Sequence, residues 1–357
     1  MDDQLPIAPG KNRPAEVSDT EPSWTTLPDD ELLKLRICDL RVRIEGSELE
    51  PHVAQLFGEL ESRGLPLKPE AYLADEWFSP SWSPLIAIPF FLAHPRLKQL
   101  ELRQMLEVEG GTHDWCLQLL RHECGHAYDH AYGFSKRERW AEVFGSPDVD
   151  YEPDAYRPRP YSRSFVRHLP NWYAQAHPDE DFAETFAVWL TLPPEEWRSQ
   201  YHGWKALEKL EYLDELMKEV SEKAPPAIEK RGRTWEASRL RRTLEKYYAA
   251  KRKLYAQDFP DVYDSDLRAI FEKGDFGDES AAQIMRRMQY RLSAAIVRWT
   301  GQHKYVADTL VKRLITRARE LKLQAPRDQA ALMVDLSAYL SALVTNHLHT
   351  GKFKRFV

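Results

Sequence analysis

The sequence predicts an α+β domain followed by an all-α C-terminal region. Residues 26–204 combine short apolar segments typical of strands with longer segments in which apolar residues recur at helical spacing. From residue 205 to residue 357 the pattern is helical, with few strand signals. We therefore expect a disordered lead over residues 1–25, one domain over residues 26–204 and a helical domain over residues 205–357, close to the usual domain size of about 150 residues.

Two short segments of the first domain are the expected strands. Residues 40–44 (LRVRI) alternate apolar and basic side chains, as a half-buried strand does. Residues 85–93 form an apolar run, and Pro89 within it cannot donate a hydrogen bond to a neighbouring strand. We therefore place the second strand at the edge of a sheet, where it could also pair with an extended peptide.

The helices that matter most for the first domain are expected at residues 48–63, 114–132 and 180–190. Each is followed by a glycine or a proline, which are the residues that most often end a helix. The long irregular stretch over residues 145–178 is typical of a functional or disordered loop. The C-terminal region should contain helices over residues 205–223, 234–256, 264–273, 280–299, 304–323 and 328–346.

The composition excludes several classes of protein. The chain holds 11 Trp, 16 Tyr and 14 Phe, far too many large apolar residues for a disordered chain. Its three cysteines are too few for a disulfide scaffold, and their odd number favours a reducing compartment. The N-terminus lacks the apolar core of a signal peptide, and the longest apolar run is about half of a membrane span. We therefore expect a cytoplasmic protein with no membrane partner.

The formal net charge of −6 conceals an asymmetry along the chain. Residues 205–357 carry 30 Lys and Arg against 21 Asp and Glu, a net charge of +9, which leaves −15 for residues 1–204. The most basic segment, residues 231–253, has nine basic residues interleaved with aromatic ones. Such a segment can contact nucleic acid or an acidic partner. We favour a solvated amphipathic helix, and docking against the acidic part of the same chain is a further possibility.

The strongest functional signal is RHECGHAYDH, at residues 121–130. His122 and His126 are four residues apart on one predicted helix, so both imidazoles can reach a single tetrahedral ion. Glu123 lies beside them, where its carboxylate can take a proton from a zinc-activated water. The pentapeptide HExxH also occurs by chance, but here it lies inside a helix that follows a strand, and Gly125 leaves room for another element. We therefore predict a Zn²⁺ site.

A catalytic zinc ion needs three protein ligands and one open position. His130 continues the histidine stripe, but it lies about 12 Å from His122 along the helix axis, too far to share an ion. We interpret His130 as a capping or packing residue. Cys124 faces away from the histidines, and Asp129 and His177 are left outside the predicted site.

A better third ligand lies in HPDEDFAETFAVWL, at residues 177–190. Glu180 and Glu184 are four residues apart at the start of a predicted helix, so both carboxylates point the same way. One can bind zinc while the other accepts the N–H of a ligand histidine. The alternative is an acidic first turn that the helix dipole stabilises. That alternative explains Asp179 and Asp181 well but Glu184 poorly, since Glu184 lies beyond the first turn among apolar residues.

These segments resemble a known family. HECGHAYDH, Tyr173 and HPDEDFAETFAVWL are similar to the bacterial zinc-binding metallopeptidases of gluzincin type, and also to the catalytic domain of anthrax lethal factor. In those proteins the glutamate ligand follows a tyrosine by seven residues, an interval that Tyr173 and Glu180 keep. The resemblance covers roughly residues 85–190. It does not extend to the C-terminal helices, and the zinc-ribbon segment of the bacterial relatives is absent.

The resemblance implies a zincin-like fold, in which a mixed sheet lies beside the cleft and two helices bring His122, His126 and Glu180 to zinc. It matches Glu184 to the family's second glutamate. It also implies that the Tyr173 hydroxyl stabilises the oxyanion of the tetrahedral intermediate. The residues alone give Tyr173 no such role, because it lies among many aromatic residues and fits a packing position equally well.

We therefore expect a zinc metallopeptidase that hydrolyses peptide or protein substrates, with Glu123 as the general base. The alternative is a regulatory or interaction protein with a zincin fold, whose helical C-terminal domain binds a partner or nucleic acid. A third possibility is a structural protein with a vestigial metal site, although the intact Glu123 argues against it, since binding zinc does not require that residue. Substrate preference and oligomeric state stay open.

Overall fold

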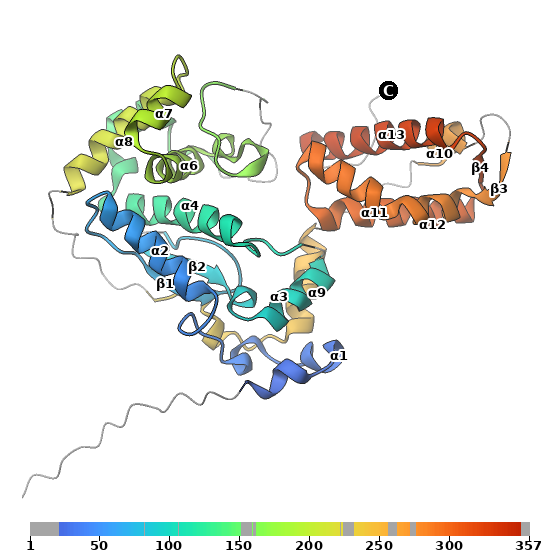
Figure 1. Ribbon diagram of the computed structural model, residues 1–357, viewed down its shortest axis with the longest axis horizontal. Helices are drawn as coiled ribbons and strands as arrows, with labels where there is room; N and C mark the ends of the chain where they lie inside the picture. Colours follow the sequence, from blue (N-terminus) through green and yellow to red (C-terminus); the bar gives the residue numbers. More distant parts are fainter. Residues whose placement is uncertain are drawn as a thin grey trace, which may run out of the picture.

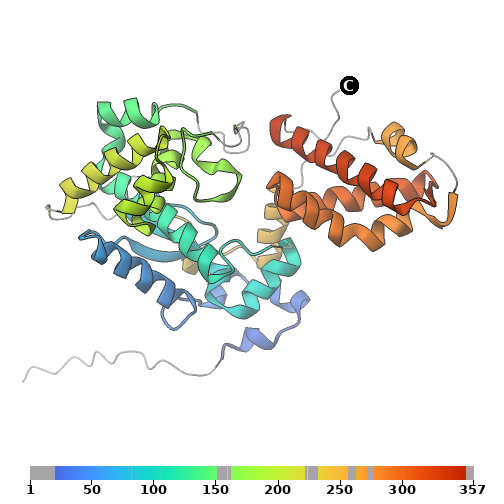
Figure 2. The same ribbon diagram turned by 45° about the horizontal axis from the view of Figure 1, so that its top comes forward.

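Helices form most of the molecule, which is seen here as a computed structural model. Figure 1 shows a larger first part at the left and a lobe built from α10 to α13 at the right, with α9 between them. The separation persists in the turned view of Figure 2. The structure describes residues 21–81, 83–105, 107–150, 159, 162–221, 223, 232–255, 263–271 and 276–350. Residues 1–20 of the expected lead lie outside these ranges.

Besides short 3-10 helices, the first part contains eleven α-helices and strands among the described residues. They are α1 (Asp29–Leu32), α2 (Leu49–Ser62), β1 (Glu70–Ala74), β2 (Leu85–Pro89), α3 (Pro95–Met105), α4 (His113–Tyr132), α5 (Glu138–Phe144), α6 (Pro178–Thr191), α7 (Pro194–Gln200), α8 (Ala206–Ser221) and α9 (Leu244–Tyr255). The expected helices over residues 48–63, 114–132 and 180–190 are therefore confirmed as α2, α4 and α6.

The second lobe is helical, as predicted, and it also contains a short sheet. Its elements are α10 (Asp264–Phe271), β3 (Phe276–Ser280), α11 (Ala281–Thr300), α12 (Lys304–Glu320), β4 (Gln324–Pro326) and α13 (Gln329–Thr350). β3 and β4 pair antiparallel, so the expected all-α region is α-helical with one small two-stranded sheet. In the described part of the chain, no helix is both long and apolar enough to cross a membrane.

The strand expected at residues 40–44 is wrong. Residues Ile37–Leu40 form a single 3-10 turn instead. Arg41 then adopts a left-handed conformation with φ of 50°, which breaks the extended path that a strand needs. The alternation of apolar and basic residues therefore reflects a turn whose apolar side chains, such as Leu40, reach the core.

The small sheet of the first part has two strands, so β2 lies at an edge, as predicted. β1 and β2 pair in parallel, from Glu70 opposite Leu85 to Ala74 opposite Pro89. On its other side, the Ala87 N–H donates to the carbonyl of Phe78 at 2.8 Å in an antiparallel bridge. The edge position is thus confirmed, although this one bridge occupies part of the free edge, and Pro89 is the last residue of β2, where a missing N–H costs little. Ala87 is consequently not open to an extended peptide.

Two large apolar clusters make up the described core. The first runs from Trp24 to Tyr248 and includes side chains of α8 and α9. The second runs from Tyr263 to Val344 and belongs to the second lobe. The apolar core therefore changes between α9 and α10, well after residue 204.

Basic side chains of the segment 231–253 pair with acidic residues of the first part. Arg233 contacts Glu70, and the Arg242 guanidinium lies 2.5 Å from the carboxylate of Asp75. Farther along, the Lys251 ammonium lies 3.1 Å from the carboxylate of Glu101, where both side chains are buried. The structure thus shows docking against the acidic part of the same chain, and it also confirms the amphipathic helix, because Leu244 and Tyr247 of α9 are buried. Nucleic-acid binding by this segment stays a prediction.

Helices α4 and α6 pack against each other at a glycine. His122 contacts Glu184 whereas His126 contacts Glu180, so the two helices run antiparallel. A Cβ at Gly125 would lie 2.8 Å from the backbone Cα of Ala183 and 3.0 Å from Phe186. These distances leave no room for a side chain, and the close approach of the two helices depends on Gly125.

Replacing Gly125 by alanine should therefore destabilise the protein. We expect the free energy of unfolding to fall by about 1–3 kcal/mol, because the added methyl group would meet backbone that cannot move freely. The measurement is urea denaturation followed by circular dichroism. Gly58→Ala is the matched control, since Gly58 lies in α2 and a Cβ added there would meet nothing within 4 Å. The control should be neutral or stabilising by up to about 1 kcal/mol, and equal losses in both variants would contradict the packing argument.

Candidate metal centre

Three of the predicted site residues converge between α4 and α6. The Nε2 atom of His122 lies 2.9 Å from Oε2 of Glu180, and Nε2 of His126 lies 3.2 Å from the same oxygen. The two Nε2 atoms are 3.1 Å apart. Among the residues that the structure describes, this is the one group of three His, Cys, Asp or Glu side chains close enough to share an ion. His122, His126 and Glu180 therefore form a cluster that could hold a metal.

The chemistry of the three atoms fits a cation. Nδ1 of His122 lies 2.8 Å from Oε1 of Glu184; a carboxylate only accepts hydrogen bonds, so this nitrogen carries the proton. In the neutral imidazole, Nε2 of His122 then has a lone pair, which points at an acceptor oxygen of Glu180. Zinc bonds of about 2.0–2.1 Å imply ligand separations of about 3.4 Å in a tetrahedron, close to the distances found.

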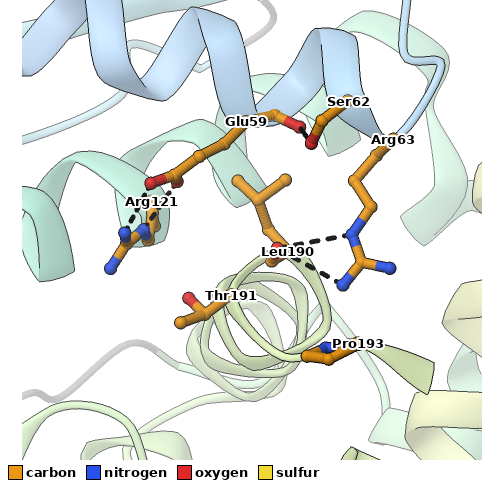
Figure 3. A pocket seen from close by; sticks show the side chains of 7 residues that line it. All are labelled: Glu59, Ser62, Arg63, Arg121, Leu190, Thr191 and Pro193. Atoms are coloured by element: carbon orange, nitrogen blue, oxygen red, sulfur yellow. Dashed lines mark hydrogen bonds and ion pairs between the residues drawn. The ribbon is translucent and has the colours of Figure 1, made fainter. Parts of the chain in front are cut away.

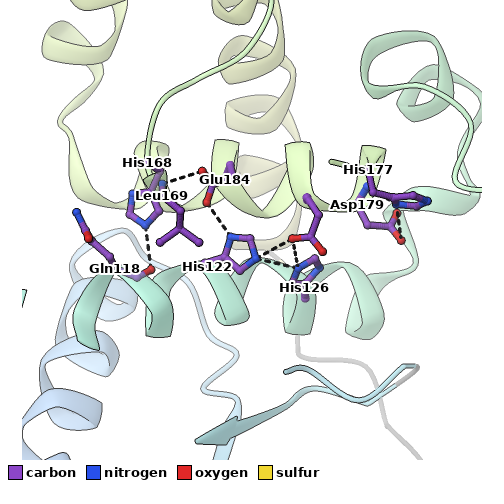
Figure 4. A network of polar contacts seen from close by, with 9 residues as sticks. Gln118, His122, His126, His168, Leu169, His177, Asp179 and Glu184 are labelled. Atoms are coloured by element: carbon purple, nitrogen blue, oxygen red, sulfur yellow. Dashed lines mark hydrogen bonds and ion pairs between the residues drawn. The ribbon is translucent and has the colours of Figure 1, made fainter. Parts of the chain in front are cut away.

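Glu184 holds His122 from the side opposite the cluster. In Figure 4 the imidazoles of His122 and His126 rise from α4 toward α6, and Glu184 points from α6 to His122. The second oxygen of Glu184 accepts the backbone N–H of Leu169 at 2.8 Å. Glu184 is almost fully buried, so both of its contacts are shielded from water. This is the arrangement that orients a metal-binding histidine and selects its tautomer.

The electrostatics of the cluster favour positive charge. Burial lowers the pKa of His122, but the carboxylates of Glu180 and Glu184 outweigh it and raise that pKa well above its usual value. Burial would raise the pKa of Glu180, yet the imidazoles of His126 and His122 hold it well below its usual range. Both shifts have one cause: the buried carboxylates attract a positive charge, whether a proton or a metal ion, to the point where the side chains meet.

Glu123 lies next to the cluster on α4. Its side chain is 6% exposed, and its Oε2 atom has no hydrogen-bond partner among the described residues. Burial raises the pKa of this carboxyl, while the neighbouring His122 and His126 oppose the shift. A buried carboxylate with an unused oxygen and a raised proton affinity has the properties of a general base.

Tyr173 lies beside the cluster in a short 3-10 helix over Pro170–Gln175. Its ring centroid is 5.6 Å from that of His122, at an interplanar angle of 49°. The preceding residue, Trp172, has a φ of 53°, a left-handed conformation that costs free energy in a bulky residue. The structure thus brings Tyr173 next to a predicted ligand.

The other polar residues of the two motifs have structural partners. His130 lies outside the cluster, with its Nδ1 3.3 Å from the Ser79 hydroxyl, and burial lowers its pKa to about 4. Asp129 accepts hydrogen bonds from the N–H and hydroxyl of Ser135. His177 caps α6, because its Nδ1 accepts from the Asp179 N–H at 3.1 Å. Cys124 is fully buried, and all three cysteines of the chain are free thiols.

Sequence reasoning missed an ion pair behind the site. The Lys209 ammonium, on α8, lies 2.5 Å from the carboxylate of Asp181, and both side chains are at least 95% buried. Asp181 follows Glu180 directly, so the pair anchors the first turn of α6. The sequence does contain a signal for this ion pair. Lys209 lies four residues before Leu213 and seven before Leu216, so a charged residue occupies a position in an otherwise apolar stripe of the helix.

His168 was missed as well, and no sequence pattern could have found it. Its Nε2 atom lies 2.9 Å from the carbonyl of Gln118 on α4, as Figure 4 shows. The contact ties the irregular stretch before α6 to α4. It thereby places the N–H of Leu169 against Glu184, a relation between distant parts of the chain.

A pocket between α2, α4 and the end of α6 lies away from the metal cluster. Figure 3 shows its lining: Glu59, Ser62, Arg63, Arg121, Leu190, Thr191 and Pro193. Arg63 donates to the carbonyls of Trp189 and Leu190 at the C-terminal end of α6, and Arg121 pairs with Glu59 at 2.6 Å. The charged side chains that line this pocket are therefore already paired, and Arg63 caps the C-terminal end of α6.

Comparison with known proteins gives a partial match. Residues 115–228 match the model of a family described as "Putative zinc-binding metallo-peptidase". The matched segment is less than half of the chain, and it contains His122, Glu123, His126 and both glutamates of α6. At this coarse level, the match and the possible metal site together support a metallopeptidase.

Two of the relatives are uncharacterized proteins of Mycobacterium tuberculosis (strain ATCC 25618 / H37Rv) and Mycobacterium bovis (strain ATCC BAA-935 / AF2122/97). Each is 39% identical over 81 residues, which cover 20% of this chain and 23% of the relative. The chain thus matches about a quarter of the length of these relatives. No solved structure matches the chain, and the similarity to anthrax lethal factor stays a prediction.

The convergent cluster predicts one zinc ion per chain. His126→Ala should lose the ion, because two remaining ligands hold zinc weakly, and Glu184→Gln should weaken zinc binding about 10- to 100-fold by disturbing His122. The measurements are metal content by mass spectrometry and competition with a chromogenic chelator. His130→Gln is the matched control, one helical turn away on α4, and should keep the full zinc content. Equal losses of zinc in the His126→Ala and His130→Gln variants would contradict the assignment of His126 as a zinc ligand.

Proposed function

We propose that the protein is a zinc-dependent metallopeptidase that hydrolyses peptide bonds. One observation supports this proposal above all: three potential ligand atoms of His122, His126 and Glu180 meet at one point, and a buried carboxylate without a full set of partners lies beside them. The family match over residues 115–228 points to the same activity. A zincin-like fold for the first part belongs to the same proposal.

His122, His126 and Glu180 would hold the zinc ion, and Glu184 would keep His122 in the correct tautomer. When bound, zinc polarises the scissile carbonyl and lowers the pKa of a water toward about 7. Glu123 takes the proton of the attacking water and later gives it to the leaving amine, so that one carboxyl serves as base and then as acid. Burial of Glu123 favours this exchange, because desolvation destabilises the carboxylate and raises its pKa. The carboxyl can therefore keep the proton until the amine leaves.

Tyr173 is proposed to stabilise the negative charge that develops on the carbonyl oxygen. Its ring lies 5.6 Å from that of His122, so the phenol is near the substrate position that the cluster defines. A hydroxyl donor aimed at the developing charge would lower the barrier more than it strengthens substrate binding.

The alternative function is a regulatory or interaction protein that keeps the zincin fold. The second lobe, with an apolar core of its own, would then be the binding part. Glu123 favours the peptidase, because zinc binding alone does not need a buried glutamate beside the ligands. The two functions differ in whether hydrolysis depends on Glu123.

Glu123→Gln should abolish peptide hydrolysis while the protein keeps its zinc. The amide has the same shape as the carboxyl but cannot accept the proton, and loss of a general base costs about 10²- to 10⁴-fold or more. The assay compares the variant with the wild type on a cell lysate and maps new N-termini by mass spectrometry. Cys124→Ala, at the next residue on the opposite side of α4, should retain activity. Zinc-bound protein without any Glu123-dependent cleavage would favour the regulatory alternative.

Tyr173→Phe should lower kcat by about 10²- to 10³-fold, the usual effect of removing one oxyanion donor. KM and zinc content should stay near the wild-type values, because the ring remains to pack against His122. Steady-state kinetics on a peptide identified in the lysate experiment measures both parameters. An unchanged kcat would assign Tyr173 to packing alone.

A further inference from the structure

The second lobe carries a helix with uncompensated positive charge. α11 contains four arginines and no Asp or Glu in its 20 residues. Within the described ranges, Arg286, Arg291 and Arg298 have no carboxylate partner, whereas Arg287 pairs with Glu279 at 2.6 Å. The basic segment 231–253 differs, since its Arg233, Arg242 and Lys251 pair with acidic residues of the first part.

The arginines lie on the face of α11 that the fold leaves open. Arg287, Arg291 and Arg298 are spaced by four and seven residues, which places them along one stripe of the helix. All three are exposed. The opposite face packs into the core of the lobe through Met285, Leu292 and Ile296. On the arginine face, Arg287 contacts Glu279 and Gln329 of the same lobe, whereas Arg291 and Arg298 form no ion pair among the described residues.

Tyr290 lies beside the arginine stripe, four residues after Arg286, and Trp299 lies in the last turn of α11 on another side of the helix. Tyr290 is 74% exposed and Trp299 is 77% exposed. The Lys304 ammonium lies 5.6 Å from the Tyr290 ring centroid, and the Arg298 guanidinium lies 5.3 Å from the Trp299 ring. Large aromatic side chains are costly to leave in water, and here each stands beside a cation with much of its surface free.

We propose that the exposed face of α11 binds single-stranded nucleic acid. Arginines at intervals along a helix neutralise phosphates, and exposed rings provide surfaces on which unpaired bases stack. An acidic protein surface would satisfy the arginines, but a single strand supplies both the phosphates for the arginines and a planar base for Tyr290 at regular intervals. The proposal concerns a surface of the second lobe and does not depend on the peptidase activity.

The test is binding of a fluorescein-labelled 20-nucleotide poly(dT) strand to the full chain, followed by anisotropy between 50 and 200 mM NaCl. Arg291→Gln/Arg298→Gln should reduce the slope of log K against log salt by about 1.4, since each phosphate contact to a single strand contributes about 0.7. Tyr290→Ala should weaken binding by about 5- to 150-fold and leave the slope unchanged, because stacking releases no counterions.

The matched control is Arg41→Gln/Arg43→Gln, which removes two exposed arginines from the first part and changes the net charge equally. It should bind as the wild type does, and circular dichroism should show that every variant is folded. No salt-dependent binding by the wild type would overturn the proposal, as would equal losses in the control and the α11 variants. Self-association that only the α11 variants lose, without binding of the strand, would assign the face to a second copy of the chain and would also overturn it.

Discussion

The close contact between α4 and α6 is the constraint on which the candidate site depends. Three polar contacts of the cluster join a histidine of α4 to a glutamate of α6, at 2.8–3.2 Å. Hydrogen bonds and metal bonds are short and weaken steeply as the partners move apart. Gly125 makes the approach possible, because no Cβ separates it from Ala183. The absence of a side chain at Gly125 therefore allows the two helices to approach closely enough for His122 to contact Glu184 and for His126 to contact Glu180.

The fold tolerates many buried polar side chains around α6, because most of them form hydrogen bonds or ion pairs with one another. Glu184 accepts from His122 and from the Leu169 N–H, and Lys209 neutralises Asp181 on the other side of α6. α6 is thus held by charge on two of its faces, which limits rotation of Glu180. Glu123 and Asp181 each keep one buried oxygen without a hydrogen-bond partner among the described residues, and only that of Glu123 lies beside the metal ligands, where a reactant could use it.

The basic residues in the C-terminal part of the chain belong to two different surfaces. Arg233, Arg242 and Lys251 pair with Glu70, Asp75 and Glu101 and hold residues 233–251 against the acidic elements of the first part. The arginines at positions 286, 291 and 298 of α11 have no such counterpart among the described residues. Net charge along the sequence could not separate these cases, since compensation depends on which acidic groups the fold brings near.

The sequence by itself determined the helices and the chemistry at single positions. Helical periodicity located α2, α4 and α6, and four-residue spacing placed His122 with His126 and Glu180 with Glu184 on common faces, because these relations lie within one helix. Tertiary structure decided the rest. It put β2 between β1 and Phe78, turned residues 37–41 away from a strand, paired Lys209 with Asp181, and brought Tyr173 to His122. Such contacts join residues far apart in the chain, and no local pattern specifies which distant partner will lie within bonding distance.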